Sequence, residues 1–167
     1  MSFRLERRLS PEELAAQLRR EARDGLTASP KRMRSRWIWD ARGSELYGRI
    51  MELPQYYLPG AEREILAARA GEIDSLVHPR RVVELGPGSS VKTPLLLDGL
   101  GGLEHYVAID VSEDALAAAG RRLAERYTDL DLVGIVGDFE TGLPGHEARS
   151  EERRVGKECR SRWSPYH

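Results

Sequence analysis

Cysteine is almost absent from this 167-residue sequence, and long apolar runs are absent altogether. The single Cys159 cannot form an internal disulfide, and with four scattered histidines it provides no cluster typical of a zinc site. No apolar run reaches the about eighteen residues of a membrane span, and the N-terminus lacks the apolar segment of a secretory signal. We therefore expect no metal site, no redox role, no membrane contact and a cytoplasmic protein.

An excess of charge of one sign is also missing, because 26 Lys and Arg residues nearly balance 27 Asp and Glu residues. Basic residues cluster only in residues 30–36 and in residues 149–167. This balance does not indicate a nucleic-acid-binding surface. With 40% hydrophobic residues, the chain can form one soluble domain with a sizeable core. We expect a monomer whose partner is a small molecule.

The first part of the sequence has the periodicity of helices. Residues 10–13 show the pattern of a helix start with a capping box, and Gly25 is a natural helix end. Apolar residues at helical spacing predict a second helix that ends before Pro54 and a third over residues 61–77. We expect these three helices to precede any strand and assign residues 1–78 to an N-terminal helical lobe.

The period then changes to that of buried strands at residues 80–86, 105–110 and 131–138. Two helical segments separate the strands, and Ser112 caps the second of them. Strands that alternate with helices predict parallel β-α-β units. The expected fold class is α/β, a Rossmann-like sheet of about three parallel strands in residues 79–148, with an uncovered edge.

The turn after the first predicted strand contains Gly86 and Gly88, which let the backbone approach a ligand closely. Alternatively, such a turn only makes a tight connection. The second strand ends in Asp110, which can accept hydrogen bonds from both hydroxyls of a ribose or can act as a capping or surface aspartate. Together the two features favour a nucleoside site, because ligands bind beyond the carboxyl ends of such strands.

The third strand ends in Asp138 and Phe139, which can offer a carboxylate to an exocyclic amine and a ring to an adenine face. Their alternative roles are turn formation and core packing. No third glycine follows Gly88, and Glu84 precedes the turn, so the pattern is not that of a dinucleotide site. With Asp110, this set resembles the nucleoside site of S-adenosylmethionine-dependent methyltransferases. The resemblance implies that Glu84 lies near the cationic methionine end of the cofactor.

From about residue 14 to residue 145, the sequence resembles the histidine-specific methyltransferase family. The segments that carry the resemblance are RDGLTASPK, LPQYY followed by AEREIL, VELGPGSSVKT and GDFE. The first segments lie outside the general nucleotide-binding fold, which makes the match specific. The resemblance implies an S-adenosylmethionine-dependent N-methyltransferase that trimethylates the α-amino group of L-histidine in ergothioneine biosynthesis. It also makes residues 1–78 the substrate lobe.

The resemblance further implies roles for single residues. Gly86 would line the cofactor, and Lys92 would lie near its carboxylate. Tyr56 takes the place of a tyrosine at the substrate imidazole, although it can instead pack against the sheet. Trp39 stands where relatives have tyrosine, which leaves a methyltransferase of the same fold acting on another amine or amino acid as an alternative. We expect no catalytic side chain, because positioning and desolvation of a neutral amine supply most of the catalysis.

The segment over residues 149–167 has no apolar periodicity and resembles a peptide translated from sequencing adapters. A disordered basic arm is the alternative interpretation. The family match covers only the first half or less of a typical member. We therefore expect a truncated enzyme that binds its cofactor weakly and turns over little or no histidine. A catalytically inactive fragment is a further alternative.

Overall fold

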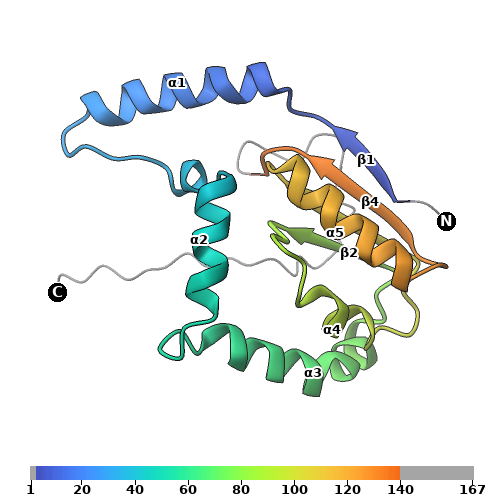
Figure 1. Cartoon of the computed structure of the whole chain (residues 1–167). Helices are drawn as coiled ribbons and strands as arrows, with labels where there is room; N and C mark the ends of the chain where they lie inside the picture. Colours follow the sequence, from blue (N-terminus) through green and yellow to red (C-terminus); the bar gives the residue numbers. More distant parts are fainter. Residues whose placement is uncertain (1–2, 140–167) are drawn as a thin grey trace.

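Four parallel strands form the centre of the fold, in the order β1-β4-β3-β2 (Figure 1). The computed structural model describes residues 3–139. The strands are β1 (Arg4–Arg7), β2 (Arg81–Leu85), β3 (His105–Asp110) and β4 (Asp131–Val136). The helices are α1 (Pro11–Thr27), the short 3-10 helix η1 (Ser35–Ile38), α2 (Ala41–Met51), α3 (Leu58–Val77), α4 (Thr93–Leu97) and α5 (Glu113–Arg126). The predicted α/β class with a parallel sheet is confirmed.

Strand β3 lies between two neighbours and is buried on both faces. Tyr106 and Ala108 belong to a core cluster that also contains residues of α4 and α5, whereas Val107 and Ile109 belong to a second cluster. Successive side chains of a strand point to opposite faces, so this division is expected. Burial on both faces explains why the sequence of β3 is an almost continuous apolar run rather than an alternating one.

The expectation that three helices precede any strand is wrong, because Arg4–Arg7 form the edge strand β1. This strand pairs in parallel with β4, with Arg4 opposite Val133 and Arg7 opposite Val136. Its sequence, RLER, contains one apolar residue and therefore lacks the pattern of a buried strand. The sheet has four strands rather than about three, with β1 at one edge; within residues 3–139, β2 forms the other edge and pairs with β3 alone. The boundary at residue 78 stays a prediction, but residues assigned to the helical lobe extend the sheet.

Helix α1 begins as predicted but ends later. Ser10 Oγ accepts a hydrogen bond from the Glu13 amide at 3.1 Å, and the Glu13 carboxylate accepts one from the Ser10 amide at 2.8 Å. The helix continues past Gly25 to Thr27. A Cβ at Gly25 would lie 2.0 Å from the Arg32 carbonyl oxygen, so this glycine permits close approach of the following loop instead of ending the helix.

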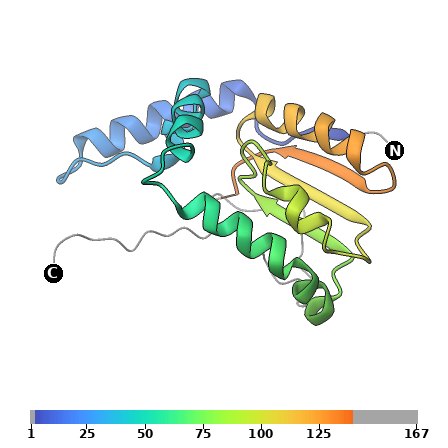
Figure 2. The same cartoon turned by 60° about the horizontal axis from the view of Figure 1, so that its bottom comes forward.

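The helical part of the molecule extends beyond the carboxyl ends of the strands. In both views the strand arrowheads point towards the side where α1 and α2 lie, while α5 covers a face of the sheet (Figures 1 and 2). Helix α3 packs against α4. Within residues 3–139, none of the helices has the length and apolar character that crossing a membrane requires. The arrangement places the first half of the chain next to the edge where parallel sheets bind ligands.

Candidate cofactor and substrate site

The turn after β2 has the backbone conformation that glycine favours. Gly86 has φ 64° and Gly88 has φ 56°, both in the left-handed region. The Gly86 amide donates to the Ile109 carbonyl at 2.8 Å, which joins the turn to the end of β3. No atom lies within 4 Å of a Cβ built at Gly88. The turn is therefore held from one side and open beside its second glycine.

Phe139 lies against this turn. The nearest atom to a Cβ built at Gly86 would be Phe139 Cε1, at 3.9 Å. The Gly137 amide donates to the Asp110 carbonyl at 2.9 Å, so the ends of β3 and β4 are also joined. Phe139 remains 39% exposed, which leaves its ring available to a ligand. The structure thus brings together residues that the sequence predicted at three separate strand ends.

The Asp110 carboxylate faces the same turn. Its Oδ1 accepts a hydrogen bond from the Ser112 amide at 3.0 Å, and the amides of Gly88 and Val111 also interact with the carboxylate. Burial raises the pKa of Asp110 above its ordinary value, and these amide bonds offset only part of that rise. A half-buried carboxylate at the end of β3, held beside the glycine turn, has the position that a ribose-binding aspartate requires.

Glu84 is held by two hydroxyl groups that the sequence reasoning did not single out. Its Oε2 accepts hydrogen bonds from the Tyr106 hydroxyl at 2.6 Å and from the Thr93 hydroxyl at 2.8 Å. Burial and the neighbouring Glu84 carboxylate raise the pKa of Tyr106, so this tyrosine stays a neutral donor. The available signal was a tyrosine beside the aliphatic residues of a strand predicted to be buried, since a buried hydroxyl requires a partner.

Lys92 and Asp138 form ion pairs with residues from the first half of the chain. Lys92 Nζ pairs with the carboxylate of Glu62 in α3. Asp138 pairs with the guanidinium of Arg36, which belongs to η1. Asp138 follows the end of β4 and Lys92 precedes α4, and both predicted cofactor residues already have protein partners. Spacing along the sequence did not indicate these pairs, because the partners are 30 and 102 residues apart.

Trp39 and Tyr56 lie on either side of Tyr47, and these three residues are called the aromatic cluster below. The Trp39 and Tyr47 ring centroids are 5.0 Å apart with an interplanar angle of 88°, and those of Tyr47 and Tyr56 are 6.3 Å apart at 72°. Edge-to-face contacts of this kind are favourable. The sequence reasoning did not single out Tyr47 for the site, yet it joins the two predicted substrate residues.

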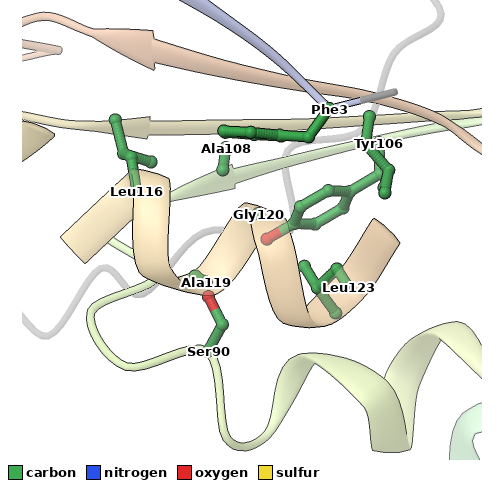
Figure 3. A pocket seen from close by; sticks show the side chains of 9 residues that line it. Phe3, Ser90, Tyr106, Ala108, Leu116, Ala119, Gly120 and Leu123 are labelled. Carbon is green, nitrogen blue, oxygen red and sulfur yellow. The ribbon is translucent and has the colours of Figure 1, made fainter. Parts of the chain in front are cut away.

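An internal cavity of about 10 Å³ lies between the sheet and α5 (Figure 3). Phe3, Leu116 and Leu132 are among the side chains that line it, and Ser90 and Tyr106 add hydroxyl groups. It has the volume of about one water molecule and is far smaller than a ligand pocket. The cavity is a gap in the core behind the glycine turn, and the candidate site lies on the open side of that turn.

The fold is that of a Rossmann-like α/β domain, with the glycine turn, Asp110 and Phe139 gathered at the strand ends. The left-handed glycines, the carboxylate of Asp110 and the exposed ring of Phe139 fit an adenosine moiety. Residues 3–139 contain no group of three or more His, Cys, Asp or Glu side chains placed to hold a metal ion.

The sequence profile of the histidine-specific, S-adenosylmethionine-dependent methyltransferases matches residues 18–157, and the chain belongs to this family. The predicted family membership is confirmed. Members of the family are methyltransferases that depend on S-adenosylmethionine. The predicted cofactor is therefore the one that the family uses. The match includes η1, α2 and α3 as well as the strands β2, β3 and β4.

Curated relatives carry related names. The chain is 37% identical over 146 residues to the histidine N-alpha-methyltransferase of Mycolicibacterium smegmatis, covering 86% of this chain and 46% of that protein. It is 40% identical over 129 residues to the protein of the same name from Mycobacterium tuberculosis, covering 75% and 40%. It is 32% identical over 119 residues to ergothioneine biosynthesis protein 1 of Neurospora crassa, covering 68% and 13%. The chain thus spans less than half the length of these relatives.

Proposed function

We propose that the protein acts as an S-adenosylmethionine-dependent N-methyltransferase on the α-amino group of L-histidine, in ergothioneine biosynthesis. The observation that carries the proposal is the meeting of Gly86, Asp110 and Phe139 at the strand ends, in a chain of this family. The aromatic cluster comes from the part of the chain that lies beyond those strand ends. The two parts would hold the two reactants.

In this proposal the nucleoside site holds the cofactor through the backbone of the glycine turn and three side chains. Asp110 accepts hydrogen bonds from the ribose hydroxyls, Asp138 accepts one from the adenine amine, and Phe139 contacts the adenine ring. Glu84 supplies negative charge near the sulfonium, and Lys92 supplies positive charge for the carboxylate of the methionine part. When bound, the cofactor supplies an electrophilic methyl group.

The acceptor site must hold an amine in its neutral form, with the nitrogen lone pair in line with the methyl group. The rings of the aromatic cluster lie nearly perpendicular to their neighbours, so the imidazole could contact the face of one ring and the edge of another. Tyr56 offers its hydroxyl as a hydrogen-bond partner. Each transfer would form an N–C bond while the S–CH3 bond breaks, leaving neutral S-adenosylhomocysteine and moving the positive charge to nitrogen; a proton must leave that nitrogen before the next transfer. Aromatic faces near the nitrogen stabilise that developing charge.

Isothermal titration with S-adenosylhomocysteine tests the nucleoside site directly. We expect saturable binding to the 167-residue chain and a loss on the order of 30-fold or more in Asp110→Ala, because hydrogen bonds to a charged group contribute about 1.5–3 kcal/mol. Asp129→Ala, which removes an exposed aspartate that precedes β4, is the matched control and should bind normally. Equal affinity of both variants would contradict the assignment of the site.

A panel of methyl acceptors, analysed by mass spectrometry, tests the substrate. Incubation with S-adenosylmethionine should add methyl groups to L-histidine only slowly, in line with the low turnover expected of this chain, and should give no product with imidazole, which lacks an α-amino group. Trp39 favours a second candidate, because an indole that is 40% exposed enlarges one side of the aromatic cluster. Methylation of another amine, with histidine left unmodified, would support that candidate.

A further inference from the structure

The most buried ion pairs in the described part of the chain lie between η1, α1 and the end of β4. Arg36 is 9% exposed, Asp138 is 5% exposed and Glu21 is 24% exposed. One terminal nitrogen of the Arg36 guanidinium pairs with Asp138, and the other pairs with Glu21. A buried charge is strongly destabilising unless it is paired. Through its two ion pairs, Arg36 joins α1 to the end of β4, which lies far away in the sequence.

Trp37 completes this charged cluster. Its indole N–H donates to Glu21 Oε2 at 2.7 Å, and the Arg36 guanidinium carbon lies 4.8 Å from the centre of the Trp37 ring. Burial alone would raise the pKa of Glu21, but the bonds from Trp37 and Arg36 outweigh it and the pKa lies below its usual value. Glu21 is therefore ionised at neutral pH and holds η1 against α1.

The segment that follows η1 carries the aromatic cluster. Trp39 comes directly after η1, and the Asp40 carboxylate caps α2 by accepting from the Gly43 amide at 2.7 Å. A Cβ at Gly43 would lie only 1.6 Å from the Ile38 carbonyl oxygen. The last residue of η1 thus touches the first turn of α2, and the two elements must move together. A displacement of Arg36 would be transmitted to Tyr47 in α2.

We propose that Arg36 is a positioning residue that couples the nucleoside site to the acceptor site. By holding the carboxylate of Asp138 at one end and η1 at the other, it determines where the aromatic cluster lies relative to the strand ends. The proposal rests on the proposed function for the identity of the two ligands. Since linkage is reciprocal, each ligand should then increase the affinity for the other.

The first test needs no ligand. Asp138→Asn should shift the indole N–H signal of Trp39 in a nitrogen-15 spectrum, with the signal assigned by Trp39→Phe. In an Arg36→Met background the same change at Asp138 should leave that signal in place, because the link is gone. Arg36→Lys should restore only part of the response, since one ammonium group does not reproduce a guanidinium that spans two carboxylates. An equal shift with and without Arg36, or no shift, overturns the proposal.

The second test measures linkage by isothermal titration of L-histidine with and without saturating S-adenosylhomocysteine. In the wild type we expect the second ligand to raise the histidine affinity by on the order of 5-fold or more, and in Arg36→Met by less than about 2-fold. Arg34→Met, which changes an exposed arginine 3.8 Å from Glu21, is the matched control and should keep the linkage. Linkage that persists in Arg36→Met overturns this proposal alone.

Failure of a variant to fold and failure of the wild type to bind either ligand must be distinguished from a loss of linkage. Arg36→Met leaves Asp138 as an unpaired buried charge, so the double variant Arg36→Met with Asp138→Asn provides a chain without that charge. It should fold, as judged by a cooperative urea titration, and still lack linkage at a concentration of S-adenosylhomocysteine that saturates this variant, in which the contact of Asp138 with the adenine amine is weakened; a linked response contradicts the proposal. A wild-type chain that binds neither ligand overturns the proposed function, and this inference with it.

Discussion

At the scale of single residues, Asp110 combines a predicted binding role with an electrostatic cost. Burial raises its pKa more than the backbone amides of Ser112 and its neighbours lower it. A carboxyl group whose pKa is higher in the folded protein than in the unfolded chain, near about 3.9, binds its proton more tightly when folded. Its contribution to stability is therefore fully present below the unfolded pKa and is lost as pH rises through the folded pKa.

This sign leads to a prediction for Asp110→Asn, which cannot ionise. The free energy of unfolding of the wild type, relative to the variant, should increase as pH is lowered from 7 to about 4. Over the same range the wild-type affinity for S-adenosylhomocysteine should fall, because ribose hydroxyls donate better to an ionised carboxylate. Urea titrations and calorimetry at a series of pH values measure both quantities.

The exposed Asp129 provides the control for the second quantity, as Asp129→Asn should bind S-adenosylhomocysteine as the wild type does at each pH. The difference in free energy of unfolding between the wild type and Asp110→Asn could instead stay constant or decrease towards low pH. That result would contradict a raised pKa of Asp110 in the folded protein.

At the scale of elements, β1 is held in place by a ring that fits over two glycines. A Cβ at Gly120 of α5 would lie 2.4 Å from the Phe3 ring, and one at Gly134 of β4 would lie 2.6 Å from it. Figure 3 shows Phe3 beside Gly120 among the residues that line the internal cavity. The absence of two side chains therefore makes the space in which the edge strand is anchored.

Gly134→Ala should displace the Phe3 ring and lower the free energy of unfolding by about 1–3 kcal/mol, the usual effect of an added methyl group in a filled core. In a Phe3→Ala background the same change should have a smaller effect, because the ring is absent and only Leu5 Cδ1, at 3.0 Å, stays close. Gly71→Ala in α3 meets nothing within 4 Å and should be neutral or stabilising by up to about 1 kcal/mol. Urea titrations of the four chains give the coupling, and additive effects would contradict the predicted contact.

At the scale of the whole molecule, the sheet and the first helix differ in how they are held. Strand β3 is paired on both sides and buried on both faces, whereas α1 contains no buried residue. The link from α1 to the strand end passes through Glu21 and Arg36. Regions with few buried contacts open at a lower free energy than the core of the same protein.

Hydrogen exchange should therefore separate two levels of stability in the native protein. The amides of β3 should exchange at the rate of global unfolding, and those of α1 should exchange much faster. Arg36→Met should accelerate exchange in α1 and η1 further while leaving β3 unchanged relative to global stability. Mass spectrometry of peptide fragments gives both rates, and equal protection of α1 and β3 would show that the charged cluster is not the main attachment.

The predictions from sequence succeeded where local signals suffice. β3 and β4 were found because burial on both faces makes continuous apolar runs, and the start of α1 was found because Ser10 and Glu13 form a local capping box. Gly86 and Gly88 were identified as glycines that let the backbone approach a ligand; both have a positive φ, and their role towards a ligand stays a prediction. The predicted roles of Lys92, Asp138 and Tyr56 towards ligands stay predictions.

The amino-acid sequence by itself determined the parallel α/β class, the glycine turn and the family, because these depend on periodicity and on short motifs. Only the tertiary structure decided that Arg4–Arg7 extend the sheet, that Tyr47 joins Trp39 to Tyr56, and that Arg36 holds Asp138. These features are contacts between segments with no local signal of their own. The position of the charged strand Arg4–Arg7 depends on its pairing with β4, and that of Arg36 depends on its ion pair with Asp138.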